Sequence, residues 1–306
     1  MFEALRGAGR DAAEIASLFW AMAAGAAVVW LIVTALVLHA MRSRRPLWSE
    51  RAGLLLIAIG GGAVPTVILA ALLAYGMPTL ARQLDTATSA SAQITVVGEQ
   101  FWWRVRYELP GGTHVELANE VRLPRDRVTA LTLTSTNVIH SFWIPALAGK
   151  VDMLPGRITH LTLEPAAAGT YRGVCAEYCG ASHARMAFIV EVMEPDAFEQ
   201  WLSAQALPAT KAGNDVTAGA TAFLRNGCGA CHSIRGSPAV ATIGPDLTHV
   251  GSRRSVGAAS LPNQADNIAR WIARPEHIKP GALMPPFAML PPDQLTAIAA
   301  YMRSLQ

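Results

Sequence analysis

One short segment carries more chemical information than any other, and it reads Cys175-Ala-Glu-Tyr-Cys179-Gly-Ala-Ser-His183-Ala-Arg-Met186. Its thiolate, imidazole and thioether side chains are soft to borderline ligands, the set that suits copper. A mononuclear blue copper site uses one cysteine, two histidines and a weak axial methionine. This segment offers two cysteines, so it can serve two metal ions if both thiolates bridge them. The alternative is a disulfide between Cys175 and Cys179, with His183 and Met186 incidental.

The segment contains a single histidine, so a second one has to come from elsewhere in the fold. The best candidate is His140, within Asn137-Val-Ile-His140-Ser-Phe-Trp-Ile-Pro145. It follows the threonine-rich run around Leu131 and Leu133, in which apolar and polar residues alternate as in a β-strand. The end of a strand can face a ligand loop, which makes His140 the expected partner of the cysteines.

The part of the chain that contains these residues has the pattern of a β-sandwich or barrel. From Gln93 onward, short alternating runs are separated by turn signals at Pro110-Gly111-Gly112, Pro155-Gly156 and Ala168-Gly169. A short helix with proline in its first turn is expected from Pro195 to about Ala206.

A second motif, Cys228-Gly-Ala-Cys231-His232, is the attachment signature of c-type heme. The two thiols form thioethers to the heme, and His232 becomes the proximal iron ligand. For the second axial ligand we choose Met284, with Met289 as its competitor; a methionine–histidine pair raises the heme potential. The alternative is a redox disulfide of the thioredoxin type, which expects a βαβ context that this sequence lacks.

The pattern around the second motif is helical. Residues 207–214 read as a linker, and helices are expected over 215–226, 265–274 and 292–305. The last of these has one apolar face, which we expect to pack over the heme edge, formed by Leu295, Ile298, Ala299 and Met302.

The first eighty residues have the composition of a membrane anchor. Overall 52% of the residues are hydrophobic and only 15% are charged, which is too apolar for a soluble protein of this length. Residues 15–40 and 52–77 contain no charged side chain, and each run can cross a hydrocarbon core of about 30 Å. We interpret the first as a retained helix, not a cleaved signal peptide. Pro65 lies within the second and could kink it.

The positive charge of the chain is concentrated between these two runs. Arg42, Arg44, Arg45 and Arg51, set against Glu50, account for the whole net charge of +3. Because positive loops stay on the cytoplasmic side, both termini are expected in the periplasm or its equivalent. No basic face is left to bind nucleic acid, so none is expected as a partner.

Residues 1–205 resemble the dinuclear copper A subunit of cytochrome c oxidase, subunit II. The resemblance rests on the cysteine segment, on the segment containing His140, and on Val151-Asp-Met-Leu-Pro-Gly-Arg157. In that family the copper pair is held by the residues that match His140, Cys175, Cys179, His183 and Met186, and by the backbone carbonyl that matches Glu177. The Glu177 side chain would reach a magnesium ion at the interface with subunit I.

Residues 213–306 resemble a small cytochrome c. Within them, Gly244-Pro245-Asp246-Leu247 matches the loop that supports the proximal histidine in that family. The resemblances together imply a transmembrane hairpin (1–80), a cupredoxin-like copper A domain (93–206) and a cytochrome c domain (213–306). They imply a subunit of a proton-translocating oxidoreductase of the bacterial inner membrane. Electrons would pass from a donor cytochrome through heme c and copper to the heme of subunit I, where oxygen is reduced. Subunit III is a further expected partner.

Two other functions remain open at this point. One is the same role in a copper A nitric-oxide reductase, and the other is a membrane-tethered copper carrier, which would have no need of heme. Two features also depart from the family pattern. The aromatic cluster used for electron uptake begins with Phe101, often tryptophan in the family, and continues with Trp102 and Trp103. The glutamate that many relatives carry before the proline of the second span has no counterpart near Ala58, so that proton-path role is not carried over.

Overall fold

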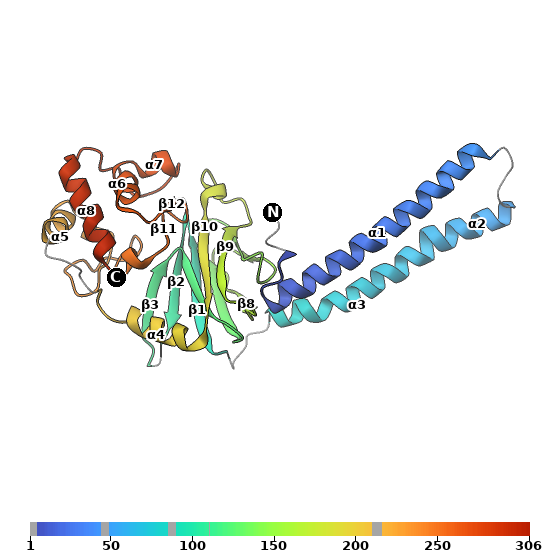
Figure 1. Ribbon diagram of the computed structural model, residues 1–306, viewed down its shortest axis with the longest axis horizontal. Helices are drawn as coiled ribbons and strands as arrows, with labels where there is room; N and C mark the ends of the chain where they lie inside the picture. The colour runs from blue at the N-terminus through green and yellow to red at the C-terminus, as the bar shows by residue number, and fades with distance from the viewer. Residues whose placement is uncertain (1–4, 44–48, 85–89, 110, 210–215) are drawn as a thin grey trace.

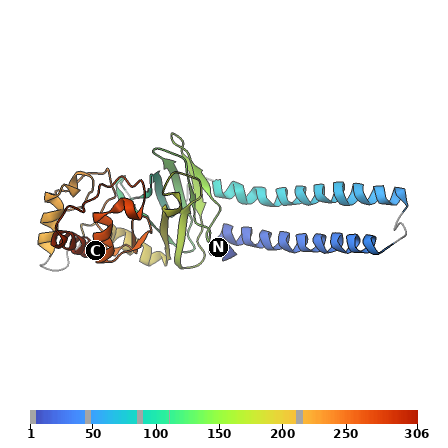
Figure 2. The same ribbon diagram turned by 90° about the horizontal axis from the view of Figure 1, so that it is seen from above.

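The structure is a computed structural model that describes residues 5–43, 49–84, 90–109, 111–209 and 216–306. It has three parts, and the β-sandwich lies between a long helical hairpin and a small helical domain (Figures 1 and 2). Several features expected from the sequence lie outside the described residues: Arg44, Arg45, Pro110, Asp215 and part of the linker over 207–214.

The hairpin is built from two helices whose apolar side chains are almost all exposed. Helix α1 covers Arg10–Arg42, and the returning helix consists of α2 (Glu50–Ala58), the π-helical segment η2 (Ile59–Ala63) and α3 (Val64–Leu84). The spans Arg10–Arg42 and Glu50–Pro78 have mean hydropathies of 2.4 and 2.3, and both are long and apolar enough to cross a membrane. A helix that is apolar on all sides and unburied requires a nonaqueous surrounding such as lipid.

Pro65, which the sequence suggested could kink the second span, lies next to a local departure from α-helical geometry. The π-helical segment comes immediately before it, with Val64 N–H bonded to the carbonyl of Ile59. A proline removes one helical donor and crowds the carbonyl four residues earlier, and a π turn is a known way to absorb such a misfit.

The middle part is a sandwich of two five-stranded sheets within the described residues. The first has the order β3-β2-β1-β5-β8 and the second the order β4-β10-β9-β6-β7. The first sheet is made of β1 (Ala92–Glu99), β2 (Trp102–Glu108), β3 (His114–Ala118), β5 (Thr129–Ser135) and β8 (Thr159–Leu163). The second is made of β4 (Glu120–Pro124), β6 (His140–Trp143), β7 (Val151–Met153), β9 (Gly169–Cys175) and β10 (Ala187–Met193).

The core of the sandwich follows from the alternation seen in the sequence. Leu131 and Leu133 of β5 are buried, whereas Thr132 and Thr134, which alternate with them, are half-buried. Between the sheets, the ring of Phe188 stacks on Phe142 at a centroid distance of 4.7 Å and meets the edge of Trp103 at 5.2 Å. Apolar and aromatic burial of this kind contributes most of the stability of the domain and gives β6 and β9 a rigid support.

The C-terminal part is a small helical domain with its own core. It follows helix α4 (Pro195–Gln205), which ends the sandwich as expected. Its helices are α5 (Val216–Arg225), α6 (Ala265–Ala273), α7 (Pro275–Ile278) and α8 (Pro292–Ser304). Ile298, Ala299 and Met302 of α8 are buried, as the apolar face of that helix predicted.

Candidate metal and heme sites

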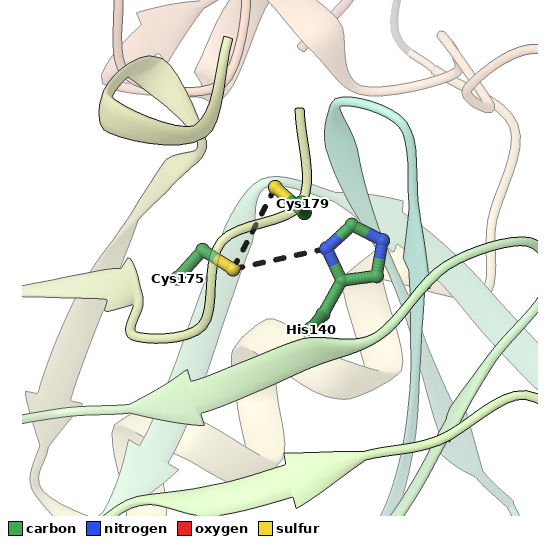
Figure 3. Close-up of side chains that lie close together, drawn as sticks. All are labelled: His140, Cys175 and Cys179. Carbon is green, nitrogen blue, oxygen red and sulfur yellow. Dashed lines mark hydrogen bonds between the residues drawn. The ribbon is translucent and has the colours of Figure 1, made fainter. Parts of the chain in front are cut away.

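The predicted copper ligands converge at one end of the second sheet. Strand β9 ends at Cys175, β6 begins at His140, and the two strands pair so that Phe142 lies opposite Cys175. This register brings the Nδ1 atom of His140 to 3.7 Å from the Sγ atom of Cys175. The ligand atoms of His140, Cys175 and Cys179 all lie within 4.8 Å of one another, and the three residues are buried (Figure 3).

The other predicted ligands complete the same cluster. The Sγ atom of Cys179 lies 3.7 Å from Nδ1 of His183 and 3.8 Å from Sδ of Met186. The carbonyl oxygen of Glu177 lies 3.2 Å from the sulfur of Cys175. The carboxylate of Glu177 points elsewhere, to 3.7 Å from the Lys150 ammonium, and is partly exposed.

Both cysteines of this cluster are free thiols. Their sulfurs are 3.9 Å apart, whereas a disulfide bond measures about 2.0 Å. The hydrogen bond with Cys179 lowers the pKa of Cys175, and the same contact raises the pKa of Cys179. Two sulfurs that compete for one proton, ringed by imidazole and thioether donors, fit a pair of soft metal ions bridged by thiolates.

The surroundings hold the cluster in place. A Cβ atom added at Gly98 would lie 2.7 Å from the ring of His140, so only glycine leaves room for the ring. The side chain of Gln100 donates a 2.7 Å hydrogen bond to the carbonyl of Cys179. Outer contacts of this kind orient the ligands and are part of what a metal site requires.

The heme motif opens into an apolar cavity of about 310 Å³. Cys228, Cys231, His232 and Met284 all line it, together with Ile298 and Met302 of α8, among other apolar side chains. Cys228 and Cys231 are free thiols, available to form thioethers. A largely apolar cavity with two thiols, an imidazole and a thioether at its wall fits a covalently bound heme.

His232 is oriented by its neighbours. Its Nδ1 atom lies 2.8 Å from the carbonyl oxygen of Pro245, which leaves Nε2 for the cavity. A Cβ atom at Gly244 would lie 2.7 Å from the ring. Burial lowers the pKa of His232, so the ring is neutral and can ligate a metal. The Gly244-Pro245 segment therefore supports this histidine, as the resemblance implied.

The two methionines that compete for the sixth position are placed differently. Met284 lines the cavity, whereas Met289 is 75% exposed and is not among the residues that line it.

Sequence reasoning missed how closely the two sites approach each other. The side chain of Ser182, in the copper loop, donates a 2.6 Å hydrogen bond to the carbonyl of Pro280 in the loop that leads to Met284. The ring of Phe101 packs between the same two loops. A Cβ atom added at Gly180 of the copper loop would lie 3.2 Å from this ring, and one added at Gly281 of the other loop would lie 3.0 Å from it.

The aromatic cluster is split between two environments. Phe101 and Trp102 line the heme cavity, and Trp103 is fully buried in the core of the sandwich. A second contact between the domains is made by Arg104, which donates to the carbonyl of Thr242 at 3.0 Å. No sequence pattern announces such contacts, because they depend on how two separately folded units pack.

The fold and the sites define a class of protein: a chain with two helices apolar enough to anchor it in a membrane, a cupredoxin-like domain of the copper A type and a c-type cytochrome domain. The family model described as "Cytochrome C oxidase subunit II, periplasmic domain" matches residues 106–193. The model described as "Cytochrome c" matches residues 216–306. The two families imply a copper A centre and a heme. The chain belongs to the cytochrome c oxidase subunit 2 family.

Curated relatives agree with this assignment. Cytochrome c oxidase subunit 2 of Alkalihalophilus pseudofirmus is 35% identical over 70% of this chain, and the match spans 61% of that relative's length. The subunit 2 of Bacillus sp. strain PS3 is 29% identical over 80% of this chain and 70% of the relative. That of Branchiostoma floridae is 32% identical over 45% of this chain and 67% of the relative.

Among solved structures, the periplasmic domain of subunit II of cytochrome oxidase (CoxB) of Bradyrhizobium japonicum is 28% identical. The match covers 39% of this chain and 95% of that one, with a TM-score of 0.36. The family models and the curated relatives confirm the resemblance and, with the structure, the three-part fold class predicted from the sequence.

Proposed function

We propose that the chain is the subunit through which electrons enter a respiratory terminal oxidase. Electrons would pass from a donor cytochrome to heme c, then to a dinuclear copper centre, and then to the heme of subunit I, where oxygen is reduced to water. The observation that supports this order is the contact between Ser182 and Pro280, which brings the copper loop and the Met284 loop together.

The proposal assigns a role to each site residue. His140, Cys175, Cys179, His183, Met186 and the carbonyl of Glu177 would hold the two copper ions. Cys228 and Cys231 would bind heme covalently, with His232 and Met284 as its axial ligands. The carboxylate of Glu177, which is partly exposed and paired with Lys150, would be free to meet a magnesium ion at the interface with subunit I.

These ligand sets suit electron transfer better than substrate chemistry. Metals of this kind, when bound, supply one-electron chemistry. The proposed protein ligands would fill the coordination positions of these metals, which would leave none open for a substrate as in a Lewis-acid site. The buried, closely packed surroundings of His140 and Cys175 limit rearrangement of the ligands.

The two domains act as a tethered pair in this proposal. A short connection between residues 206 and 216 raises the effective concentration of the cytochrome domain beside the copper domain. Phe101 and Trp102, the family's uptake cluster, are covered by the cytochrome domain because they line its cavity. An external donor would therefore reduce the heme, and the fused cytochrome would be the immediate donor to copper.

The membrane part of the proposal follows from helix length and charge. We place the hairpin in residues 1–80, the copper domain in 93–206 and the cytochrome domain in 213–306. The arginines between the spans would face the cytoplasm, so both soluble domains would lie on the periplasmic side of a bacterial inner membrane. Subunit I, and with it subunit III, would bind the hairpin and the copper domain.

Purification of the intact membrane complex, with metal and heme analysis, tests the proposal. It predicts two copper ions and one covalent heme per copy of this chain, with heme and copper in the partner that reduces oxygen. A non-heme iron in that partner would support the nitric-oxide alternative. A heme-free chain with exchangeable copper would support the carrier alternative and overturn the proposal.

A further inference from the structure

A buried lysine lies between the two sites and has no role in the account so far. Lys279 is 2% exposed and belongs to the wall of the heme cavity. Its backbone is held by a 2.8 Å hydrogen bond from its N–H to the carbonyl of Pro275, at the end of helix α7. The side chain is therefore carried on a well-supported turn and directed into the interior.

The ammonium group of Lys279 has few partners there. It donates one hydrogen bond, of 3.3 Å, to the carbonyl of Gly257, although an ammonium carries three donors. Among the described residues, no carboxylate forms an ion pair with it. Burial lowers the pKa of Lys279 to about 7, the nearby sulfur of Cys179 opposes that shift, and the positive charge of Arg185 adds to it. A buried ammonium without a carboxylate is costly, so a bound anion at this place would be stabilised by Lys279.

Heme supplies anions at such a place, because the macrocycle carries two propionate carboxylates on one edge. In an apolar cavity a carboxylate needs a cation or several donors to remain charged. The charged side chains that line this cavity, His232 apart, are Glu99, Arg253 and Lys279. Glu99 is already paired with Arg104 at 2.6 Å. Arg253 donates to the carbonyl of Asp246 and has the carboxylates of Asp246, Glu120 and Glu116 near it, which leaves Lys279 as the cation of the cavity wall without a carboxylate.

We propose that the ammonium of Lys279 binds the heme propionate nearer to the copper domain. The neighbours of Lys279 in the chain show that it lies on the side of the cavity next to the copper domain. Pro280 accepts the hydrogen bond from Ser182, and Gly281 packs on Phe101. Lys279 then neutralises a negative charge on the edge of the heme that faces copper. Neutralising that charge favours the ferrous state and keeps the heme potential high.

The inference rests on the proposed attachment of heme at Cys228 and Cys231, and it is tested in the full-length chain in detergent. Lys279→Met keeps the volume and removes the charge, and Lys279→Arg keeps the charge. Arg270→Met removes an exposed positive charge on α6 of the same domain and is the matched control. For each variant, covalent heme content and the retention of the methionine-ligated ferric spectrum are measured first, and the heme and copper midpoint potentials second.

The proposal predicts normal heme content in all three variants. It predicts about a tenfold higher ferric-to-ferrous ratio at fixed ambient potential in Lys279→Met, which is a fall of about 59 mV in the heme potential. Lys279→Arg retains most of the potential, and Arg270→Met leaves it unchanged. Resonance Raman bands of the propionates shift in Lys279→Met alone.

An unchanged heme potential in Lys279→Met, with heme content intact, overturns the proposal. So does a shift confined to the copper potential, which would make Lys279 a partner of the Cys179 thiolate instead. Absence of covalent heme from the unsubstituted chain is a separate outcome, because it contradicts the proposed function and not the role of the lysine.

Discussion

The hydroxyl of Ser182 lies 2.6 Å from the carbonyl oxygen of Pro280, and this hydrogen bond joins the loop of the copper ligands to the loop of the proposed heme ligand. Ser182 sits between Cys179 and His183 in the sequence, and Pro280 comes shortly before Met284. Two electron carriers on one chain are thus in contact at the loops that carry their proposed ligands, so neither domain needs to move for the sites to face each other.

The first prediction concerns the two thiolates. Replacing Cys179 by serine removes one of the two proposed bridging sulfurs, and we expect the copper content of the purified chain to fall from two ions to one or none. Metal analysis per covalent heme measures this. Tyr178→Phe, at an exposed position of the same loop, is the control and retains both ions. Full copper loading in the serine variant would exclude a bridging role for Cys179.

The second prediction separates the two methionines. Because Met284 lines the cavity and Met289 is exposed, Met284→Ala is expected to abolish the absorption band of methionine-ligated ferric heme and to lower the heme potential. Met289→Ala leaves both unchanged. Optical spectra and redox titration of the two variants decide the matter, and the reverse pattern would reassign the sixth ligand.

The third prediction concerns the space beside His140. A Cβ atom at Gly98 would lie 2.7 Å from the imidazole, so Gly98→Ala is expected to displace the ring and reduce copper loading or alter the copper absorption bands. Gly53→Ala, in the anchor helix, meets no atom within 4 Å and serves as the control. Normal copper spectra in Gly98→Ala would contradict the rigid placement of His140 that this close packing implies.

The fourth prediction concerns a buried charge cluster at the junction of the domains. Arg104 pairs with Glu99 and Glu116 and donates to the carbonyl of Thr242. Arg104→Ala leaves Glu99 without its cation and Glu116 with Arg106 alone, and it is expected to cost about 3–5 kcal/mol in the free energy of unfolding.

Arg125→Ala provides the comparison, because Arg125 forms ion pairs that are largely exposed to solvent. Its cost is expected to stay within about 1 kcal/mol. Thermal unfolding of both variants, with heme and copper bound, measures the difference. Equal midpoints would mean that the pairs of Arg104 contribute no more than surface pairs do.

The two candidate sites were largely predictable from the sequence, because the spacing of cysteine, histidine and methionine in the two motifs is typical of metal and heme binding. The alternation around Leu131 predicted a strand, and His140 was placed correctly beside the cysteines from its position after that strand. Met284 was preferred to Met289 for the sixth position, but both lie in loops, and only the folded domain shows that Met284 lines the cavity and that Met289 is exposed.

The junction of the domains was not predictable. Lys279 stands next to Pro280-Gly281 in a polar, turn-like segment, where a lysine is usually exposed. Its burial depends on the packing of the cytochrome domain against Phe101 and Ser182, residues more than ninety positions away in the chain. Likewise, the π-helical segment before Pro65 was not predicted, because its hydrogen bonds depend on the neighbouring backbone as well as on the proline.

The most direct test of the central claim is electron paramagnetic resonance of the oxidised chain, loaded with copper and with the heme signal subtracted. Two copper ions bridged by Cys175 and Cys179 share one unpaired electron, so the hyperfine pattern should show equal coupling to both nuclei. A pattern from one nucleus in a fully loaded sample, or a sample that binds no copper because the two sulfurs have formed a disulfide, would contradict the account.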